Sequence, residues 1–126
     1  MEKNWKYVKP LENRDSVRVF LKKYRINLPK SMIETLETYN GGRPADKRIL
    51  TSAKREYVFK TLLSYNENDK ETIYGVYPDP FRKLGLYPIA SEAAGNYVCY
   101  DVTNRNWVLY NHEVDRVERI VEMAIL

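Results

Sequence analysis

The hydrophobic positions in the first third of the chain repeat with the period of an α-helix. Residues 15–26 place four apolar side chains on one face, at positions i, i+3, i+4 and i+7: Val17, Phe20, Leu21 and Tyr24. The opposite face of this segment is rich in lysine and arginine. Asp15 stands directly before it and is predicted to be the N-cap, because its carboxylate can accept from the free amides of a first turn. The pattern therefore predicts a first helix after Asp15.

A second amphipathic segment covers residues 28–40, with Pro29 suited to a first helical turn. Its apolar positions are Met32, Ile33, Leu36 and Tyr39. It stops at Asn40-Gly41-Gly42. A phosphate-binding loop needs glycines before a helix, where the amides and the dipole face the anion, whereas these glycines follow one. We predict instead that Asn40 or Gly41 adopts the left-handed conformation that ends a helix. The two helices, joined by residues 25–29, are expected to form a helical hairpin.

After Pro44 the pattern changes to alternating β-branched, aromatic and polar residues, which is typical of strands. A helical turn over 71–76, ended by Gly75 and Pro78, is expected to interrupt them. The predicted strands are 55–66, 85–90, 96–102 and 107–112, and the last two form a hairpin through the asparagine-rich turn 103–106. Residues 117–126 suit either a strand or a short helix. The fold class is α+β, a single domain over 1–126 with an N-terminal helical hairpin packed against an antiparallel sheet.

Composition narrows the class of protein. At 126 residues with 44% hydrophobic side chains, the chain is long enough to bury one core. No apolar run approaches the ~18 residues of a membrane span, and the charged N-terminus lacks the apolar region of a secretion signal. The single cysteine, Cys99, fits a reducing compartment. We expect a cytoplasmic protein without membrane contact.

Charge is divided unevenly along the chain. Residues 1–60 hold 15 Lys and Arg against 7 Asp and Glu, a balance of +8, whereas residues 61–126 hold 6 against 10, a balance of −4. The whole-chain value of +4 hides this difference. It indicates either two surfaces of opposite sign or ordinary solvated lysine-rich helix faces.

Candidates for catalysis or metal binding are few. With His112 as the only histidine, a histidine pair for a metal site is excluded. A dyad of Cys99 and His112 is conceivable, but a cysteine among tyrosines in the middle of a strand is more typical of an inert core residue. Glu113 and Asp115 are more typical of a solvated turn than of a general acid and base. We predict no enzymatic activity, no cofactor and no metal.

Tyrosine is over-represented, at 11 of 126 residues. Tyrosine and tryptophan are enriched at protein interfaces and also provide stacking platforms for single-stranded nucleic acid. Aromatic side chains also stabilise strands by cross-strand packing, and we expect about half of these residues to serve in the core and in such pairs. Aromatic anchors coincide with negative charge in the second half of the chain. The predicted partner-binding residues are Tyr74, Tyr77, Asp79, Tyr100, Asp101, Trp107 and Tyr110. Asp101 has an alternative role, because an aspartate in a strand often bonds to the adjacent turn.

The order of short motifs resembles that of the SUKH superfamily, the Smi/Knr-type domain, over roughly Val17 to Glu113. Each motif is weak alone, but five in this order are fairly specific. The matching positions are Leu28-Pro29, Asn40-Gly41-Gly42, Pro88-Ile89-Ala90 with Gly95-Asn96, Asp101, and His112-Glu113. We expect these positions to be mainly structural.

The resemblance implies an α+β fold without enzymatic activity. In bacteria such domains mostly act as immunity proteins, which bind and neutralise a cognate secreted toxin, often a nuclease. The leading hypothesis is therefore a toxin-binding immunity protein that acts by protein–protein contact. The alternative is a nucleic-acid-binding module that uses the basic N-terminal half. Oligomeric state is not indicated by these residues.

Overall fold

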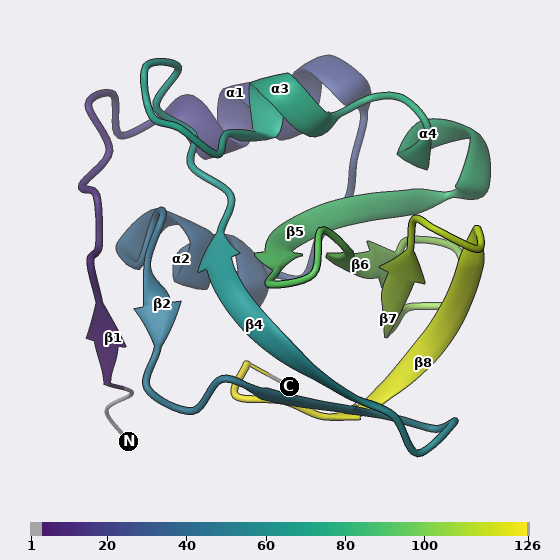
Figure 1. Cartoon of the computed structure of the whole chain (residues 1–126). Coiled ribbons are helices and arrows are strands. Elements are labelled where there is room, and N and C mark those ends of the chain that lie inside the picture. Colours follow the sequence, from purple (N-terminus) through teal and green to yellow (C-terminus); the bar gives the residue numbers. More distant parts are fainter. Residues whose placement is uncertain (1–3, 126) are drawn as a thin grey trace.

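The computed structural model describes residues 4–125. Its main feature is a closed barrel of antiparallel strands in the order β3-β4-β5-β6-β7-β8 (Figure 1). The strands are β3 Arg48–Thr51, β4 Glu56–Leu62, β5 Leu86–Glu92, β6 Tyr97–Asp101, β7 Asn106–Asn111 and β8 Arg116–Glu122. A separate two-stranded sheet pairs β1, Trp5–Lys6, with β2, Arg43–Pro44.

The helices are short. They are α1 Ser16–Tyr24, α2 Lys30–Thr38, α3 Ile73–Val76 and α4 Phe81–Leu84. The predicted amphipathic faces of the first two helices are confirmed, since the buried side chains of α1 and α2 belong to the predicted stripes. No helix within residues 4–125 is long and apolar enough to cross a membrane.

The α+β class with antiparallel sheets is confirmed, but the arrangement of the helices was only partly predicted. Arg18 of α1 and Glu37 of α2 form an ion pair at 2.9 Å, yet the two helices do not form a clear helical hairpin. α1 also contacts α3, which lies at the same end of the barrel in Figure 1. The aromatic side chains of α1 explain this placement, because Phe20 packs against Tyr74 of α3 with ring centroids 5.4 Å apart.

Asp15 precedes α1 as predicted, but its side chain makes no capping hydrogen bond. The backbone amide and the hydroxyl of Ser16 both donate to the carbonyl oxygen of Asn13, at 3.0 and 2.8 Å. The capping prediction for the Asp15 carboxylate is therefore wrong. The Asn13 carbonyl oxygen, in the turn before α1, accepts from the first amide of the helix in its place.

The strands predicted from alternation correspond to β4, β5, β6 and β7. The segment left open between strand and helix is β8 over residues 116–122. β3 was not predicted, and it closes the barrel by pairing with β4 on one side and β8 on the other. It is four residues long and follows a charged stretch, so little local pattern marks it.

A buried carboxylate joins the strands where the barrel closes. Glu118 of β8 is 5% exposed and accepts hydrogen bonds from side chains of neighbouring elements. The donors are Thr51 Oγ1 at 2.7 Å, Arg55 Nη1 at 2.7 Å, Tyr57 Oη at 3.1 Å and Arg116 Nε at 3.1 Å. Burial acts to raise the pKa of Glu118, but these donors together hold it below its usual value. The ionised carboxylate therefore supports the closure of the barrel.

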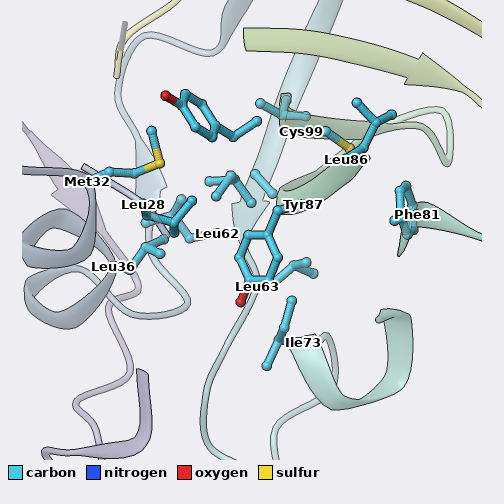
Figure 2. Packing of buried hydrophobic residues seen from close by; sticks show 14 of the residues in the cluster. Leu28, Met32, Leu36, Leu62, Leu63, Ile73, Phe81, Leu86, Tyr87 and Cys99 are labelled. Carbon is cyan, nitrogen blue, oxygen red and sulfur yellow. The ribbon is translucent and has the colours of Figure 1, made fainter. Parts of the chain in front are cut away.

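The hydrophobic core lies between the barrel and the helices. Figure 2 shows Leu28, Met32 and Leu36 beside Leu62, and Tyr87 between Leu63 and the strands. The hydroxyl groups of Tyr87 and Tyr65 share a hydrogen bond of 2.6 Å, and burial raises the pKa of both tyrosines. This bond satisfies two polar groups inside an apolar cluster.

Candidate partner-binding site

The turn after α2 is a helix stop, as predicted. Gly41 has a φ of +67°, the left-handed region that a glycine adopts without strain. The side chain of Asn40, 1% exposed, connects three segments. Its Nδ2 donates to the carbonyl oxygen of Lys9 at 2.8 Å and to Ser64 Oγ at 3.0 Å, and its Oδ1 accepts from the amide of Tyr65 at 2.8 Å. Asn40 therefore holds the N-terminal arm against the segment that follows β4.

Gly42 is required for a close approach of the backbone. A Cβ atom there would lie 2.8 Å from the carbonyl oxygen of Tyr39 and 3.0 Å from Val8 Cγ2. The first distance is shorter than real Cβ atoms show and its partner is backbone, so a larger residue has to shift the turn at the end of α2 and press on Val8 of the arm. The glycine pair therefore shapes the turn that follows α2.

A second family motif is also structural. Asn96 is 3% exposed, and its Nδ2 donates to the buried carboxylate of Glu92 at 2.9 Å. Its Oδ1 accepts from the backbone amide of His112 at 3.2 Å and lies 2.9 Å from His112 Nδ1. Gly95 has a φ of +91° and leaves space for the His112 ring, which a Cβ would approach to 3.1 Å. These residues tie the β5–β6 turn to the end of β7.

The remaining motif positions have similar places. Leu28 is buried, Pro29 immediately precedes α2, and Pro88 lies opposite Cys99 in the sheet. Glu113 is exposed, and its backbone amide donates to Asn111 Oδ1 at 3.1 Å within the β7–β8 turn.

The structure gives no support to a catalytic dyad. Cys99 is fully buried, and burial raises the pKa of its thiol well above the usual value, which keeps it protonated. His112 is exposed, and its ring bonds Asn96 instead. Among residues 4–125 there is no group of three or more His, Cys, Asp or Glu side chains placed to hold a metal ion.

The predicted partner-binding residues do not form one surface. Tyr100 and Trp107 lie directly opposite each other on β6 and β7, with ring centroids 5.8 Å apart. Tyr110 lies opposite Tyr97, an odd number of residues away along both strands, so it points to the other face of the hairpin. There its ring packs against Phe81 of α4, and its hydroxyl donates to Asp115 at 2.6 Å.

The two predicted aspartates also lie apart. Asp101 Oδ1 accepts from the amides of Thr103 and Asn104, both at 3.0 Å, and its Oδ2 accepts from Asn104 Nδ2 at 2.9 Å. Although partial burial acts to raise the pKa of Asp101, these bonds hold it below its usual value. The alternative role in the adjacent turn is the one the structure shows. Asp79 is exposed between two prolines ahead of α4.

Tyr74 and Tyr77 come together with α1. They line a hollow of about 660 Å³, whose other wall is formed by the first helix. The helix contributes Ser16, Val19, Phe20, Lys23 and Tyr24, and the loop that follows β4 contributes Tyr65, Asn66, Glu67 and Asn68. We call this hollow the α1–α3 groove.

Aromatic contacts set the shape of the α1–α3 groove. Tyr24 packs edge-on against Tyr77, and Phe20 against Tyr74, with ring centroids 5.1 and 5.4 Å apart. The hydroxyl of Tyr74 donates to the carbonyl oxygen of Tyr65 at 3.0 Å. Burial raises the pKa of both Tyr74 and Tyr77, so the groove presents neutral phenols near pH 7.

Exposed apolar surface is also found here. Val19 of α1 is 61% exposed and Tyr74 is 39% exposed, although both are large hydrophobic residues. The rim carries charges of both signs, Lys23 on the helix and Glu12 and Glu67 outside it. Val19 was not among the predicted site residues. Its signal in the sequence is that it is an apolar residue on the basic face of an amphipathic helix.

These features define a small α+β domain that has an aromatic groove on its helical side. The family model SUKH_6, described as SMI1-KNR4 cell-wall, matches residues 14–122. The chain therefore belongs to the SMI1-KNR4 family of SUKH domains, as the order of its motifs predicted. No curated protein and no solved structure matches the chain.

Proposed function

We propose that this protein is a non-enzymatic immunity protein, which binds a cognate toxin through the α1–α3 groove and blocks it by covering its surface. Membership of the SUKH family supports a protein as the partner. The observation that carries the proposal is the groove itself, where exposed Val19 and Tyr74 stand beside the rings of Tyr24 and Tyr77.

The composition of the groove fits a protein partner. Tyrosine rings give a large contact area with little loss of side-chain entropy, and they recur among the residues that dominate binding energies. An apolar or aromatic side chain of the toxin would occupy the space between α1 and α3. Glu12 and Glu67 at the rim suit the basic surface of a nuclease toxin, because opposite charges steer association.

Of the predicted interface residues, Tyr74 remains as an exposed contact, and Tyr77, 6% exposed, lies at the floor of the α1–α3 groove. Tyr100 and Trp107 line a different hollow, beneath α2. Tyr110 packs against α4 and Asp101 stabilises its own turn. If these residues also contacted the toxin, the toxin would have to bind a second surface of this protein, separate from the α1–α3 groove.

The test begins with the reading frame beside the gene. If it encodes a large secreted protein with a C-terminal toxin domain, that domain is expressed in cells with and without this protein, and survival is measured. Wild type should protect the cells, and the purified proteins should form a complex. Val19→Asp should lose protection, because it places a charge on the apolar wall of the groove.

The matched control is Val114→Asp. Val114 is 57% exposed in the β7–β8 turn, so the same chemical change is made far from the groove in sequence and on another element. It should protect as wild type does. Full protection by folded Val19→Asp and Tyr74→Ala variants would place the interface elsewhere and refute the groove. Failure of the wild-type protein to bind or protect would refute the function itself.

A further inference from the structure

A second exposed aromatic side chain lies away from the α1–α3 groove. Tyr7 directly follows β1 and is 72% exposed, the highest value among the large hydrophobic residues that the structure describes. Its φ is +59°, an unusual conformation for a residue with a bulky side chain. Two residues earlier, Trp5 stacks on Tyr39 with ring centroids 5.0 Å apart and anchors the strand. The backbone turn therefore projects Tyr7 outward from an anchored strand.

One side of the Tyr7 ring is supported by a cation. The guanidinium carbon of Arg43, on the adjacent strand β2, lies 5.4 Å from the ring centroid. The pairing of Lys6 with Arg43 in the two-stranded sheet fixes this arrangement. Because Tyr7 is 72% exposed, the rest of its ring is open to solvent, and exposed aromatic rings beside basic side chains serve as stacking platforms for bases.

Positive charge surrounds this ring. Two shallow hollows of about 280 and 400 Å³ meet at Tyr7 and Arg43. Their basic side chains are Lys6, Lys9, Arg43, Lys47 and Lys70. Within residues 4–125 none of these five forms an ion pair with a carboxylate. We call this surface, with Tyr7 at its centre, the Tyr7 face.

The two acidic residues of the Tyr7 face are already engaged. Glu71 forms an ion pair with Lys60 at 3.0 Å, and the carboxylate of Asp69 accepts hydrogen bonds from Ser64 and Asn66. Among residues 4–125, the charged side chains that line the smaller hollow are Lys6, Arg43 and Lys47, with no acidic one. Net positive charge therefore faces solvent on both sides of the ring.

We propose that the Tyr7 face binds single-stranded nucleic acid. One base stacks on the open side of the Tyr7 ring, and neighbouring phosphates lie against the lysines. An acidic protein segment would use the charges but has no need of an exposed ring. A duplex keeps its bases stacked inside, so the ring favours a single strand.

The experiment measures the fluorescence anisotropy of a labelled oligothymidylate of about 12 nucleotides, a length typical of single-strand sites. The full chain is titrated at about 50 mM and about 200 mM salt. If three phosphates are contacted, binding should weaken roughly twentyfold between these two conditions. A duplex of the same length and a poly-glutamate peptide are the comparison ligands, and both should bind more weakly.

The variants separate the ring from the charges. Tyr7→Ala should weaken binding about tenfold, whereas Tyr7→Phe should bind as wild type does, because the ring alone stacks. Lys6→Gln combined with Lys47→Gln should weaken binding and reduce its salt dependence. Lys83→Gln removes one exposed charge on α4 and should have no effect. Circular dichroism confirms that each variant is folded.

Three results would overturn the proposal. One is absence of oligothymidylate binding by the wild-type chain at the lower salt concentration. Another is equal affinity of Tyr7→Ala and Tyr7→Phe, which would show that the ring takes no part. The third is equal or tighter binding of poly-glutamate, which would make the Tyr7 face a site for an acidic protein segment.

Discussion

Three of the family-motif residues are buried inside the fold, whereas the α1–α3 groove presents side chains to solvent. Asn40, Asn96 and Gly42 are buried and make contacts only within the fold. Tyr74 and Val19 present side chains to solvent on the helical side. Asn40, Asn96 and Gly42 thus join segments of the fold to one another.

The motif residues and the groove residues should differ in how much a substitution changes the free energy of unfolding. A change at a motif residue should reduce the free energy of unfolding, whereas a change in the groove should leave it almost unaltered. Hydrogen bonds account for the difference, because removing a buried partner leaves the other groups unsatisfied, while an exposed group bonds water instead.

The largest effect is expected for Asn40→Ala. The change removes three hydrogen bonds and leaves the Tyr65 amide and the Lys9 carbonyl without their side-chain partner. We expect a loss of about 2–3 kcal/mol in the free energy of unfolding. Urea unfolding followed by circular dichroism measures it. Asn27→Ala, at an exposed position, is the control and should stay within about 0.5 kcal/mol. Equal urea midpoints for Asn40→Ala and Asn27→Ala would show that the buried hydrogen bonds of Asn40 do not stabilise the fold.

The next effect concerns the two kinds of glycine. Gly42→Ala should cost about 1–3 kcal/mol, because the new Cβ would lie 2.8 Å from the Tyr39 carbonyl oxygen. Gly75→Ala is the matched control, since its Cβ would meet nothing nearer than Thr72 Oγ1 at 3.7 Å. It should be neutral or slightly stabilising within the short helix α3. Thermal midpoints of the two variants measure the contrast, and a tolerated Gly42→Ala would contradict the close approach of Gly42 to the Tyr39 carbonyl.

Most of the strands and the first two helices followed from periodicity in the sequence. The stripe of Val17, Phe20 and Leu21 and the turn between β6 and β7 are local signals, and the structure bears them out. The strand β3 has no such signal. It pairs with β4 in a hairpin and with β8 about seventy residues later in the chain, and its four residues are too few to show a clear alternation.

The α1–α3 groove was predicted only in part, because it also depends on contacts between segments that are far apart in the sequence. Tyr74 and Tyr77 were identified from aromatic content near a helical turn. Their partners Phe20 and Tyr24 lie on a helix some fifty residues earlier, and only tertiary packing brings the two segments together. The predicted interface grouped Tyr100 with Tyr110, but the register of β6 and β7 turns them to opposite faces of the hairpin.

A smaller effect is expected at Glu118, and it depends on pH. The pKa of Glu118 is lowered in the folded protein, so its ionised form contributes stability above the unfolded pKa of about 4.3. That contribution decreases as pH falls through this value and is lost below the folded pKa. Near pH 7, Glu118→Gln should cost about 1–2 kcal/mol, because its arginine partners are partly exposed and screened.

Unfolding of wild type and Glu118→Gln is therefore compared at several values of pH between about 3 and 7. The difference between the two proteins should shrink as pH falls. The exposed Glu113→Gln variant is the control for a change of net charge. A difference that stays constant with pH would show that the carboxylate acts through its shape and not through its charge.

The smallest effect on stability is expected for Tyr74→Phe, a substitution in the α1–α3 groove. It removes one hydroxyl, whose hydrogen bond to the Tyr65 carbonyl is 3.0 Å long and partly exposed. Because water can replace the lost donor, we expect a cost of about 0.5 kcal/mol, well below that of Asn40→Ala. Toxin binding should survive in Tyr74→Phe and fail in Tyr74→Ala, since the ring supplies the contact area. Urea unfolding and a binding titration with the same samples measure both quantities. If Tyr74→Phe is as destabilising as Asn40→Ala, then the groove is part of the structural framework, and exposed residues elsewhere must contact the toxin.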